Sequence, residues 1–316
     1  MLRTPLLYLS NAHWARTLVT RLGFARRAAS RFVAGETADD AIAAIQNLNA
    51  QSINATLDHL GESVSTEAEA QRAADSYLLV LEKIQAARVC SNVSIKLTQF
   101  GLDLGEAFCV ATVRRVIEQA RQFGNFVRID MEGSAYTDRT LAVFGTLRQE
   151  FDNVGIVLQA YLYRTEADLQ SLLAVGARVR LCKGAYQEPA DKAFPLKGDV
   201  DENYFKLARM LLDAAPNWPP AGREGRLPPL PGLATHDEKL VSRLEGYIGQ
   251  IGLPREYFEF QMLYGIRRDL QQRLAAKGWP VRVYVPYGTE WYPYFMRRLA
   301  ERPANVWFFV SNLVKR

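Results

Sequence analysis

Two adjacent arginines near the end of the chain have the residue type and the spacing to bind an anion. In the segment YFMRRLAE, Tyr294, Arg297, Arg298 and Glu301 recur at intervals of three and four residues. A helix over 292–301 would therefore place them on one face. Paired guanidinium groups match the planar geometry of a carboxylate or a phosphate. The other positions are aromatic or apolar, which favours a helix that covers a site. The alternative is a solvated face with a weak Arg298–Glu301 pair.

The chain ahead of this helix alternates between predicted strands and predicted helices. Thr66 and Glu69 have capping-box spacing, a capped helix is predicted from Thr165 to Gly176, and 265–278 repeats apolar positions at helical intervals. This alternation predicts a parallel sheet, and eight strands predict closure into a (β/α)8 barrel. No G-x-G-x-x-G follows a strand, which argues against an open dinucleotide-binding sheet. The strand segments are INATLDHLG, VSIKLTQFG, FVRIDMEG, VGIVLQAYLY, ARVRLCKGAY, PGLATHDE, FEFQMLYG and VRVYVPYG.

The chain divides into two predicted parts, an N-terminal helical arm over 1–50 and a barrel domain over 51–316. Residues 1–35 contain six arginines and no acidic residue, so the other 281 residues carry a net charge of about −1. A nearly neutral body argues against nucleic-acid binding, which needs a basic surface on the folded domain. The segment 216–231 holds six of the fourteen prolines. It is predicted to be a surface loop, with a linker between domains as the alternative.

The composition is that of a soluble globular protein, with 48% hydrophobic and 23% charged residues. The sequence lacks a membrane-spanning apolar run and a secretory signal, so a cytoplasmic protein is expected. An organelle transit peptide is the alternative interpretation of the arginine-rich start. Three distant cysteines and three scattered histidines lack metal-ligand spacing, so no bound metal is expected.

Polar residues stand near the carboxyl end of nearly every predicted strand. A charged side chain in a strand buried on both faces needs a partner, and active sites of this fold form at that rim. Each residue alone would suit a structural ion pair, but their repetition at one end predicts a site. Arg180 and Lys183 differ in strand parity, so they face one way only if the chain leaves regular geometry near Lys183 and Gly184, which glycine permits. The residues are Glu62, Lys96, Asp130, Gln159, Arg180, Lys183, His236, Gln261 and Tyr284.

Several of these segments resemble signatures of the proline dehydrogenase family, in the short single-function bacterial form and not the long fusion with an aldehyde dehydrogenase. The resemblance implies a distorted (β/α)8 barrel with the last helix over its mouth and non-covalent FAD. It also implies oxidation of L-proline to Δ1-pyrroline-5-carboxylate, with hydride transfer to flavin N5 and electrons passed to a membrane quinone. The arginine-rich arm suits peripheral contact with the inner membrane face. The segments are SIKL, LQAYLYR, RLCKGAYQEP, ATHDE, FEFQMLYGIRRDLQ and VYVPYGTEWYPYFMRRLAE.

The resemblance assigns roles around the substrate. It implies that Arg297, Arg298 and Lys96 hold the proline carboxylate, with Asp130 beneath the site. Glu62 is similar to a gate residue that pairs with Arg297. The ring wall is formed by Tyr186, Leu263, Tyr284 and Tyr294. The implied catalytic set is Lys96, Asp130, Tyr284, Tyr294, Arg297 and Arg298.

The resemblance also implies a set of flavin contacts. Cys182 stands where many relatives have valine, and Lys197 is a less regular match to a phosphate contact. The proline-rich segment is longer than the usual connection and is expected to border the adenine side. The flavin positions are Gln159, Arg180, Cys182, Lys183, Gly184, Ala185, Lys197, Thr235, His236, Gln261 and Glu301.

Two other function classes fit part of the pattern. A lysine at a barrel rim forms Schiff bases in some lyases, so Lys96 or Lys183 would serve an aldolase-like enzyme. A membrane-surface binding module built on the arginine-rich arm is the non-enzyme alternative. A yellow chromophore in the purified protein distinguishes a flavoenzyme from both.

Overall fold

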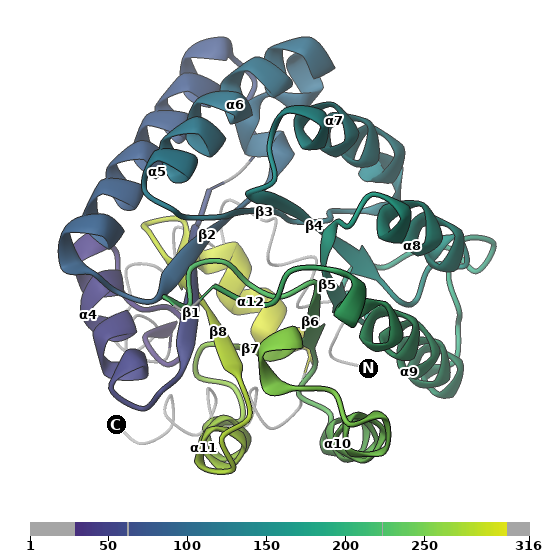
Figure 1. Cartoon of the computed structure of the whole chain (residues 1–316). Coiled ribbons are helices and arrows are strands. Elements are labelled where there is room, and N and C mark those ends of the chain that lie inside the picture. Colours follow the sequence, from purple (N-terminus) through teal and green to yellow (C-terminus); the bar gives the residue numbers. More distant parts are fainter. Residues whose placement is uncertain (1–28, 62, 223, 302–316) are drawn as a thin grey trace, which may run out of the picture.

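The computed structural model describes residues 29–61, 63–222 and 224–301. Within these residues, eight parallel strands pair in sequence order and close into a barrel, as the alternating pattern predicted (Figure 1). Each predicted apolar segment contains one strand, because these runs are long enough to be buried on both faces. The strands are β1 (Asn54–His59), β2 (Ser91–Ile95), β3 (Val127–Ile129), β4 (Val154–Gln159), β5 (Arg178–Cys182), β6 (Pro231–Ala234), β7 (Glu259–Leu263) and β8 (Val281–Tyr287).

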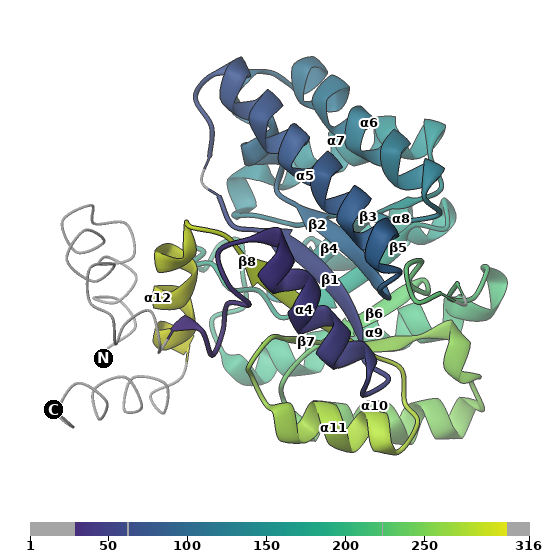
Figure 2. The same ribbon diagram turned by 90° about the vertical axis from the view of Figure 1, so that its left-hand side faces the viewer.

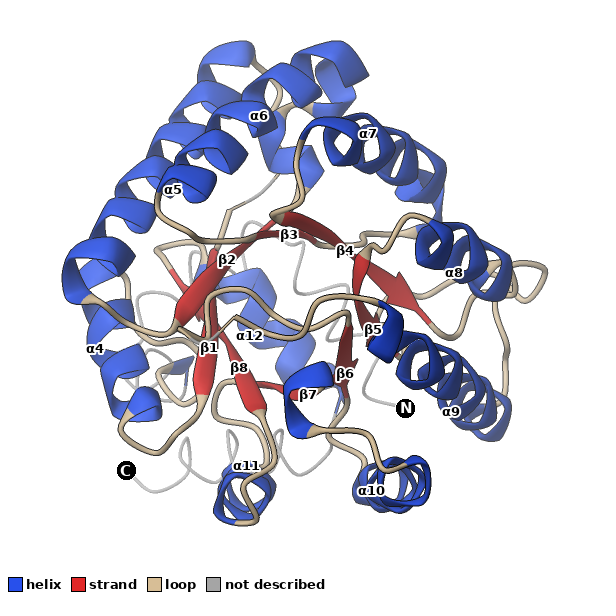
Figure 3. Ribbon diagram, in the orientation of Figure 1, coloured by secondary structure: helices blue, strands red, loops and turns tan. Residues whose placement is uncertain are grey.

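Helices surround the ring of strands, as the blue and red elements of Figure 3 show. The buried apolar faces of all of them except α12 (Trp291–Glu301) form one continuous core with the strands of the barrel. No described helix has the length and apolarity that a bilayer span requires. The helices are α4 (Ala38–Asn49), α5 (Glu67–Ala87), α6 (Glu106–Gln122), α7 (Thr137–Glu150), α8 (Thr165–Ala174), α9 (Lys197–Ala214), α10 (Glu238–Ile251), α11 (Arg268–Ala276) and α12 (Trp291–Glu301).

Residues 29–50 of the predicted N-terminal arm are described, and they include helix α4. It begins with a capping box between Thr37 and Asp40, and Ile42 and Ile45 are buried in the main core. The arm therefore packs on the barrel wall at this end. Residues 1–28, which contain five of the six arginines of the basic segment, lie outside the described residues.

The local helix signals are only partly confirmed. The capping box at Thr66 and Glu69 is present at the start of α5. The capping role predicted for Thr165 is wrong, because the N-cap of α8 is Arg164 and it has no side-chain cap. The Thr165 hydroxyl instead donates to the main-chain oxygen of Gln159 at 2.6 Å. The main-chain oxygen of Gln159 thus takes the hydroxyl that would otherwise cap the helix, and the sequence does not show that these two groups are neighbours.

The proline-rich segment 216–231 is only partly the surface loop that the sequence predicted, because its first half is largely exposed but most of 225–231 is buried. It leads into the amino end of β6, so it crosses the barrel end opposite α12 (Figures 1 and 2). Arg226 is buried there and donates to the main-chain oxygen of Phe123 at 3.2 Å. Asn92 in β2 donates to the main-chain oxygen of Arg226 at 3.0 Å. The segment closes the amino end of the barrel and does not border the carboxyl-end pocket. The linker alternative is also wrong, since β5 and β6 are paired neighbours.

Helix α12 lies over the carboxyl end of the barrel, away from the ring of outer helices (Figure 2). Its apolar face packs Phe295, Met296 and Leu299 against Phe32 and Ile266 in a separate hydrophobic cluster. Pro293 is tolerated in its first turn, where the main-chain N–H needs no helical partner. Because this face is anchored, the opposite face with the arginine pair is directed to the barrel mouth.

Candidate active site

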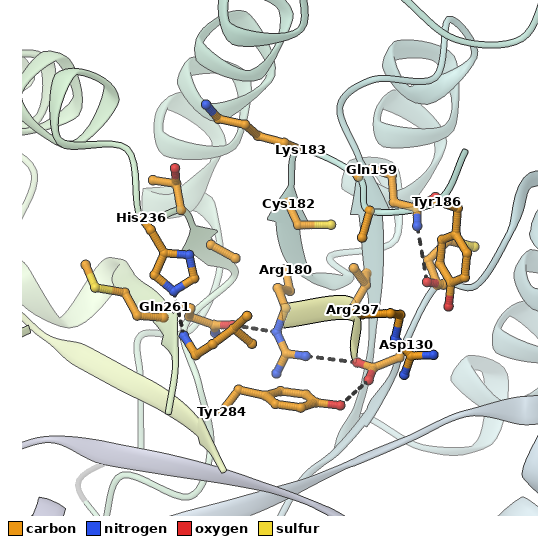
Figure 4. Close-up of a pocket in the computed structure, with 18 of the residues that line it drawn as sticks. Asp130, Gln159, Arg180, Cys182, Lys183, Tyr186, His236, Gln261, Tyr284 and Arg297 are labelled. Carbon is orange, nitrogen blue, oxygen red and sulfur yellow. Dashed lines mark hydrogen bonds and ion pairs between the residues drawn. The ribbon is translucent and has the colours of Figure 1, made fainter. Parts of the chain in front are cut away.

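A cavity of about 660 Å³ opens at the carboxyl end of the strands, beneath α12. Every predicted site residue whose side chain is described lines it. Glu62 lies outside the described residues, and Glu301 is described only as the last residue of α12. Figure 4 shows part of the lining. The predicted residues that line the cavity are Lys96, Asp130, Gln159, Arg180, Cys182, Lys183, Gly184, Ala185, Tyr186, Lys197, Thr235, His236, Gln261, Leu263, Tyr284, Tyr294, Arg297 and Arg298.

A cluster of opposite charges forms the floor of one half of the cavity. Lys96 Nζ lies 2.6 Å from Asp58 Oδ1 and 3.6 Å from Asp130 Oδ2. Tyr284 donates its hydroxyl to Asp130 Oδ2 at 2.8 Å, and Lys96 Nζ lies 3.2 Å from the same hydroxyl. These side chains come from four neighbouring strands or their ends, β8, β1, β2 and β3, and each is held by at least one other.

The charge states of this floor follow from its pairing. Burial disfavours the charged form of Lys96, but the Asp58 and Asp130 carboxylates outweigh it and raise the Lys96 pKa above its usual value. Burial opposes ionisation of Asp130 as well, yet Lys96 and Arg180 lower its pKa. Burial and the Asp130 charge raise the Tyr284 pKa well above its usual value. At neutral pH Lys96 is therefore an ammonium and not a free amine, which argues against a Schiff-base role.

Arg180 of β5 lies beside this floor and is fixed from several sides. It donates from one terminal nitrogen to Asp130 Oδ1 at 2.9 Å and to Ser94 Oγ at 3.1 Å (Figure 4). Its guanidinium carbon lies 5.2 Å from the centroid of the Tyr284 ring. Arg180 is only 7% exposed. A planar cation in one orientation is thus built into the centre of the cavity.

The arginine pair of α12 forms the roof above Lys96. Arg298 is buried, and its guanidinium carbon lies 4.9 Å from the centroid of the Tyr294 ring. Arg297 lies close enough to Tyr186 that its charge partly offsets the rise of the Tyr186 pKa that burial causes. The charges of Arg297 and Lys96 both oppose the rise of the Tyr186 pKa, so these two cations lie near the same tyrosine, and Arg298 lines the same cavity. Cations gathered in this way suit an anionic group such as a carboxylate.

The other half of the cavity holds a second set of charges. Lys183 Nζ lies 2.9 Å from Asp237 Oδ2 and also pairs with Asp201, while Lys197 Nζ lies 3.3 Å from Asp237 Oδ2. β5 ends at Cys182, and Gly184 has a φ of +114°. The chain leaves strand geometry at Gly184, yet Lys183 points away from Arg180, so the two side chains line the same cavity without facing one way (Figure 4). A Cβ at Gly184 would lie 2.3 Å from the Tyr161 ring, so only glycine fits.

Several residues of the cavity were not predicted from the sequence. Asp58 is the most important, because it pairs with Lys96. It lies inside a strand segment, so the rule that selected Lys96 and Asp130 would have found it. Glu132, Asp237 and Arg267 also line the cavity. About one polar residue was selected for each strand, so further polar residues just beyond the strand ends were overlooked.

The fold and this cavity define a (β/α)8-barrel protein with a pocket of charged side chains at the carboxyl end of its strands. A sequence model of the family described as proline dehydrogenase matches residues 41–310. The chain belongs to the proline dehydrogenase family.

Individual relatives agree with this membership. The chain is 38% identical to proline dehydrogenase 1 of Bacillus subtilis over 320 residues, which covers 100% of both chains. It is 43% identical to proline dehydrogenase of Deinococcus radiodurans over 292 residues, covering 91% of this chain and 90% of the relative. Among solved structures, proline utilization A from Bdellovibrio bacteriovorus inactivated by N-propargylglycine superimposes with a TM-score of 0.78 at 26% identity. That match covers 88% of this chain and 33% of the larger protein.

Proposed function

We propose that this protein oxidises L-proline to Δ1-pyrroline-5-carboxylate and uses non-covalently bound FAD as the hydride acceptor. Family membership supports the substrate, and the observation that carries the proposal is that Lys96, Arg297 and Arg298 line one cavity at the carboxyl end of the barrel. The substrate loses two electrons and two protons in total as the C–N bond becomes an imine.

The residues around this volume have complementary tasks in the proposed reaction. The three cations neutralise and orient the substrate carboxylate. Tyr186, Tyr284 and Tyr294 enclose the pyrrolidine ring, and α12 limits the entry of water from above. When the ring is held in one orientation against the hydride acceptor, the reaction becomes effectively unimolecular, and this lowers the entropic part of the activation barrier.

The other residues of the cavity fit a flavin dinucleotide. Its volume of about 660 Å³ lies in the range of cofactor pockets. Gln159 Oε1 is buried without a hydrogen-bond partner among the described residues, so it can accept from a bound ring N–H. Lys183 and Lys197 would face the phosphates, and Arg180 would lie near the ring system. When bound, FAD supplies the hydride acceptor, N5.

The proton on the substrate nitrogen has to leave before the hydride does. Lys96 is held as an ammonium and Tyr284 as a neutral phenol, so neither serves as the base at neutral pH. The surrounding cations favour the neutral amine and lower the pKa of bound proline. We propose that a water molecule accepts the proton from the substrate nitrogen.

The proposed activity is tested on the purified protein with L-proline and an artificial electron acceptor. We expect a yellow protein that releases all of its flavin when it is denatured by acid. We also expect proline to drive reduction of the acceptor, with one imine formed per acceptor pair of electrons, measured by trapping the imine with an aromatic amino-aldehyde. Flavin retained on the precipitate would contradict non-covalent binding. Acceptor reduction without a trapped imine would contradict the assigned product.

We expect Tyr284→Ser to weaken selectivity against 4-hydroxyproline. A hydroxyl pressed against the Tyr284 ring loses water without gaining a partner, at a cost of about 1 to 3 kcal/mol. The wild-type enzyme should therefore prefer proline by roughly tenfold to a hundredfold in kcat/KM. The substitution makes space, so this ratio should narrow while proline activity falls. An unchanged ratio in the mutant would mean that Tyr284 does not face the substrate ring.

We further propose a membrane quinone as the electron acceptor and the basic N-terminal arm as a peripheral membrane contact. Each basic residue near an anionic surface contributes about 1 kcal/mol. We expect cosedimentation with anionic vesicles at low salt, lost at high salt and reduced by the combined substitutions Arg16→Gln, Arg21→Gln and Arg26→Gln. Binding that neither salt nor these substitutions change would leave only a packing role for the arm.

A further inference from the structure

A line of buried polar side chains runs through the barrel interior below the cavity. Glu259 of β7 accepts from Arg282 Nε at 2.7 Å and from Gln261 Nε2 at 2.6 Å. Gln261 Oε1 in turn accepts from Arg180 Nε at 2.5 Å. The exposed fractions of these side chains' residues are small: 2% for Glu259, 1% for Arg282, 4% for Gln261 and 7% for Arg180. The line connects Arg180 in the cavity to the closed end of the barrel.

We propose that Glu259 is a positioning residue, which orients the Gln261 amide and through it the Arg180 guanidinium. An amide side chain has a donor end and an acceptor end, and both orientations have nearly the same shape. An ionised carboxylate only accepts, so Glu259 takes the NH2 end of Gln261. The carbonyl end is then directed to Arg180, which only donates. Glu259 and Arg180 therefore favour the same orientation, and without the Glu259 charge the NH2 end of Gln261 loses its strongest acceptor.

Arg282 holds the Glu259 carboxylate in place. Its two terminal nitrogens donate to the main-chain oxygens of Ala55 at 2.6 Å and Gly225 at 2.7 Å, while Nε faces Glu259. All three nitrogens are thus satisfied, and the guanidinium plane is fixed. Gly225 belongs to the proline-rich segment, so the closed end of the barrel supports the line. The proline-rich segment therefore helps to hold Arg282, and through it Glu259, in place.

The barrel wall reserves space for the Gln261 amide. A Cβ built on Gly232 of β6 would lie 2.4 Å from Gln261 Nε2. An alanine there would force the end of the Gln261 side chain to move, which a flexible side chain can do without damage to the backbone. Gly232→Ala therefore displaces the same amide while it leaves every charged side chain intact.

The orientation of Arg180 matters because of what it contacts. One terminal nitrogen donates to Asp130 Oδ1, and the guanidinium lies against the Tyr284 ring. The hydrogen bond from Arg180 Nε to Gln261 Oε1 fixes the plane of the guanidinium from the barrel interior. A released Nε allows the guanidinium to turn away from Asp130 and from the face of Tyr284. A displacement of about 1 Å in such a group can lower a rate about a hundredfold.

The direct test is the Nε–H resonance of Arg180 in 15N-labelled protein, assigned by its loss in Arg180→Lys. In the wild-type protein we expect a slowly exchanging signal. In Glu259→Gln and in Gly232→Ala we expect this signal to shift and to exchange with solvent at least tenfold faster. A signal that both variants leave unchanged in position and exchange would overturn the proposal. Should Glu259→Gln not fold, Gly232→Ala alone decides.

Thr56→Val provides the matched control. Thr56 is also buried in the barrel and donates to Asn92 Oδ1, outside the line. We expect this variant to leave the Arg180 signal unchanged. If Thr56→Val alters the signal as much as Glu259→Gln does, the effect is general damage to the core and the proposal is wrong.

A kinetic measurement, which rests on the proposed function, gives a second readout. In Glu259→Gln we expect kcat per bound flavin to fall roughly tenfold to a hundredfold, with KM for proline within about threefold of wild type. The reason is that the carboxylate contacts on α12 are untouched. A kcat equal to wild type would contradict the effect on the reaction. Absence of proline turnover in wild type would contradict the proposed function and leave the resonance test decisive for Glu259.

Discussion

Lys96→Met should lower the free energy of unfolding of the cofactor-free protein by about 3 to 5 kcal/mol, the usual cost of removing one partner of a buried pair. The reason is Asp58, whose side chain is 1% exposed and lies 2.6 Å from Lys96 Nζ. The second oxygen of Asp58 has no hydrogen-bond partner among the described residues, so Lys96 is its principal compensation. Urea denaturation of both proteins measures the difference. Proline turnover should be lost as well, because one of the three carboxylate cations is gone.

The double variant Lys96→Met with Asp58→Asn separates these two effects. It removes the uncompensated carboxylate, so it should recover most of the lost stability. It does not restore the cation, so proline turnover should stay absent. A loss below about 1 kcal/mol in the single variant would show that Asp58 does not depend on Lys96, since exposed pairs contribute that little. Recovery of turnover in the double variant would remove Lys96 from the proposed carboxylate site.

Arg297→Met and Arg298→Met should each weaken proline binding by a factor on the order of a hundred or more. Loss of one partner from a desolvated charge pair costs about 3 to 5 kcal/mol. Each 1.4 kcal/mol corresponds to about a tenfold change in affinity. The apparent dissociation constant for proline, taken from anaerobic flavin reduction at increasing proline concentration, measures the effect.

Arg243→Met is the matched control for the change in net charge. Arg243 lies on the outer helix α10 and pairs with Glu202 at 2.6 Å, with 40% of its side chain exposed. We expect its proline affinity to stay within about twofold of wild type. A change below about threefold in both α12 variants would mean that the arginine face of α12 does not hold the substrate.

The fold was largely predictable because its signals are local. Each strand is a short apolar run buried on both faces, and each outer helix has its own periodicity. The position of the arginine pair was predictable for the same reason. Tyr294, Arg297 and Arg298 share a face by helical spacing alone, and the packing of Phe295 and Leu299 then directs that face to the cavity.

The partners of the charged residues were not predictable, because they depend on strand register. Lys96 lies 38 residues from Asp58, and only the pairing of β1 with β2 brings them together. Glu259 and Arg282 likewise meet inside the barrel through the pairing of β7 with β8. The position of the proline-rich segment was not predictable for a similar reason, since composition indicates a loop but not which end of the barrel the loop covers.

The proposed reaction, in which L-proline delivers a hydride to a flavin held in this cavity, can be tested in a single absorbance measurement. L-Proline is added anaerobically to the purified protein with its bound flavin. We expect the absorption band of the oxidised flavin to bleach in proportion to added proline. We also expect Arg298→Met to require roughly a hundredfold more proline for the same bleaching. A protein with bound flavin whose band does not change at any proline concentration would contradict the proposed reaction.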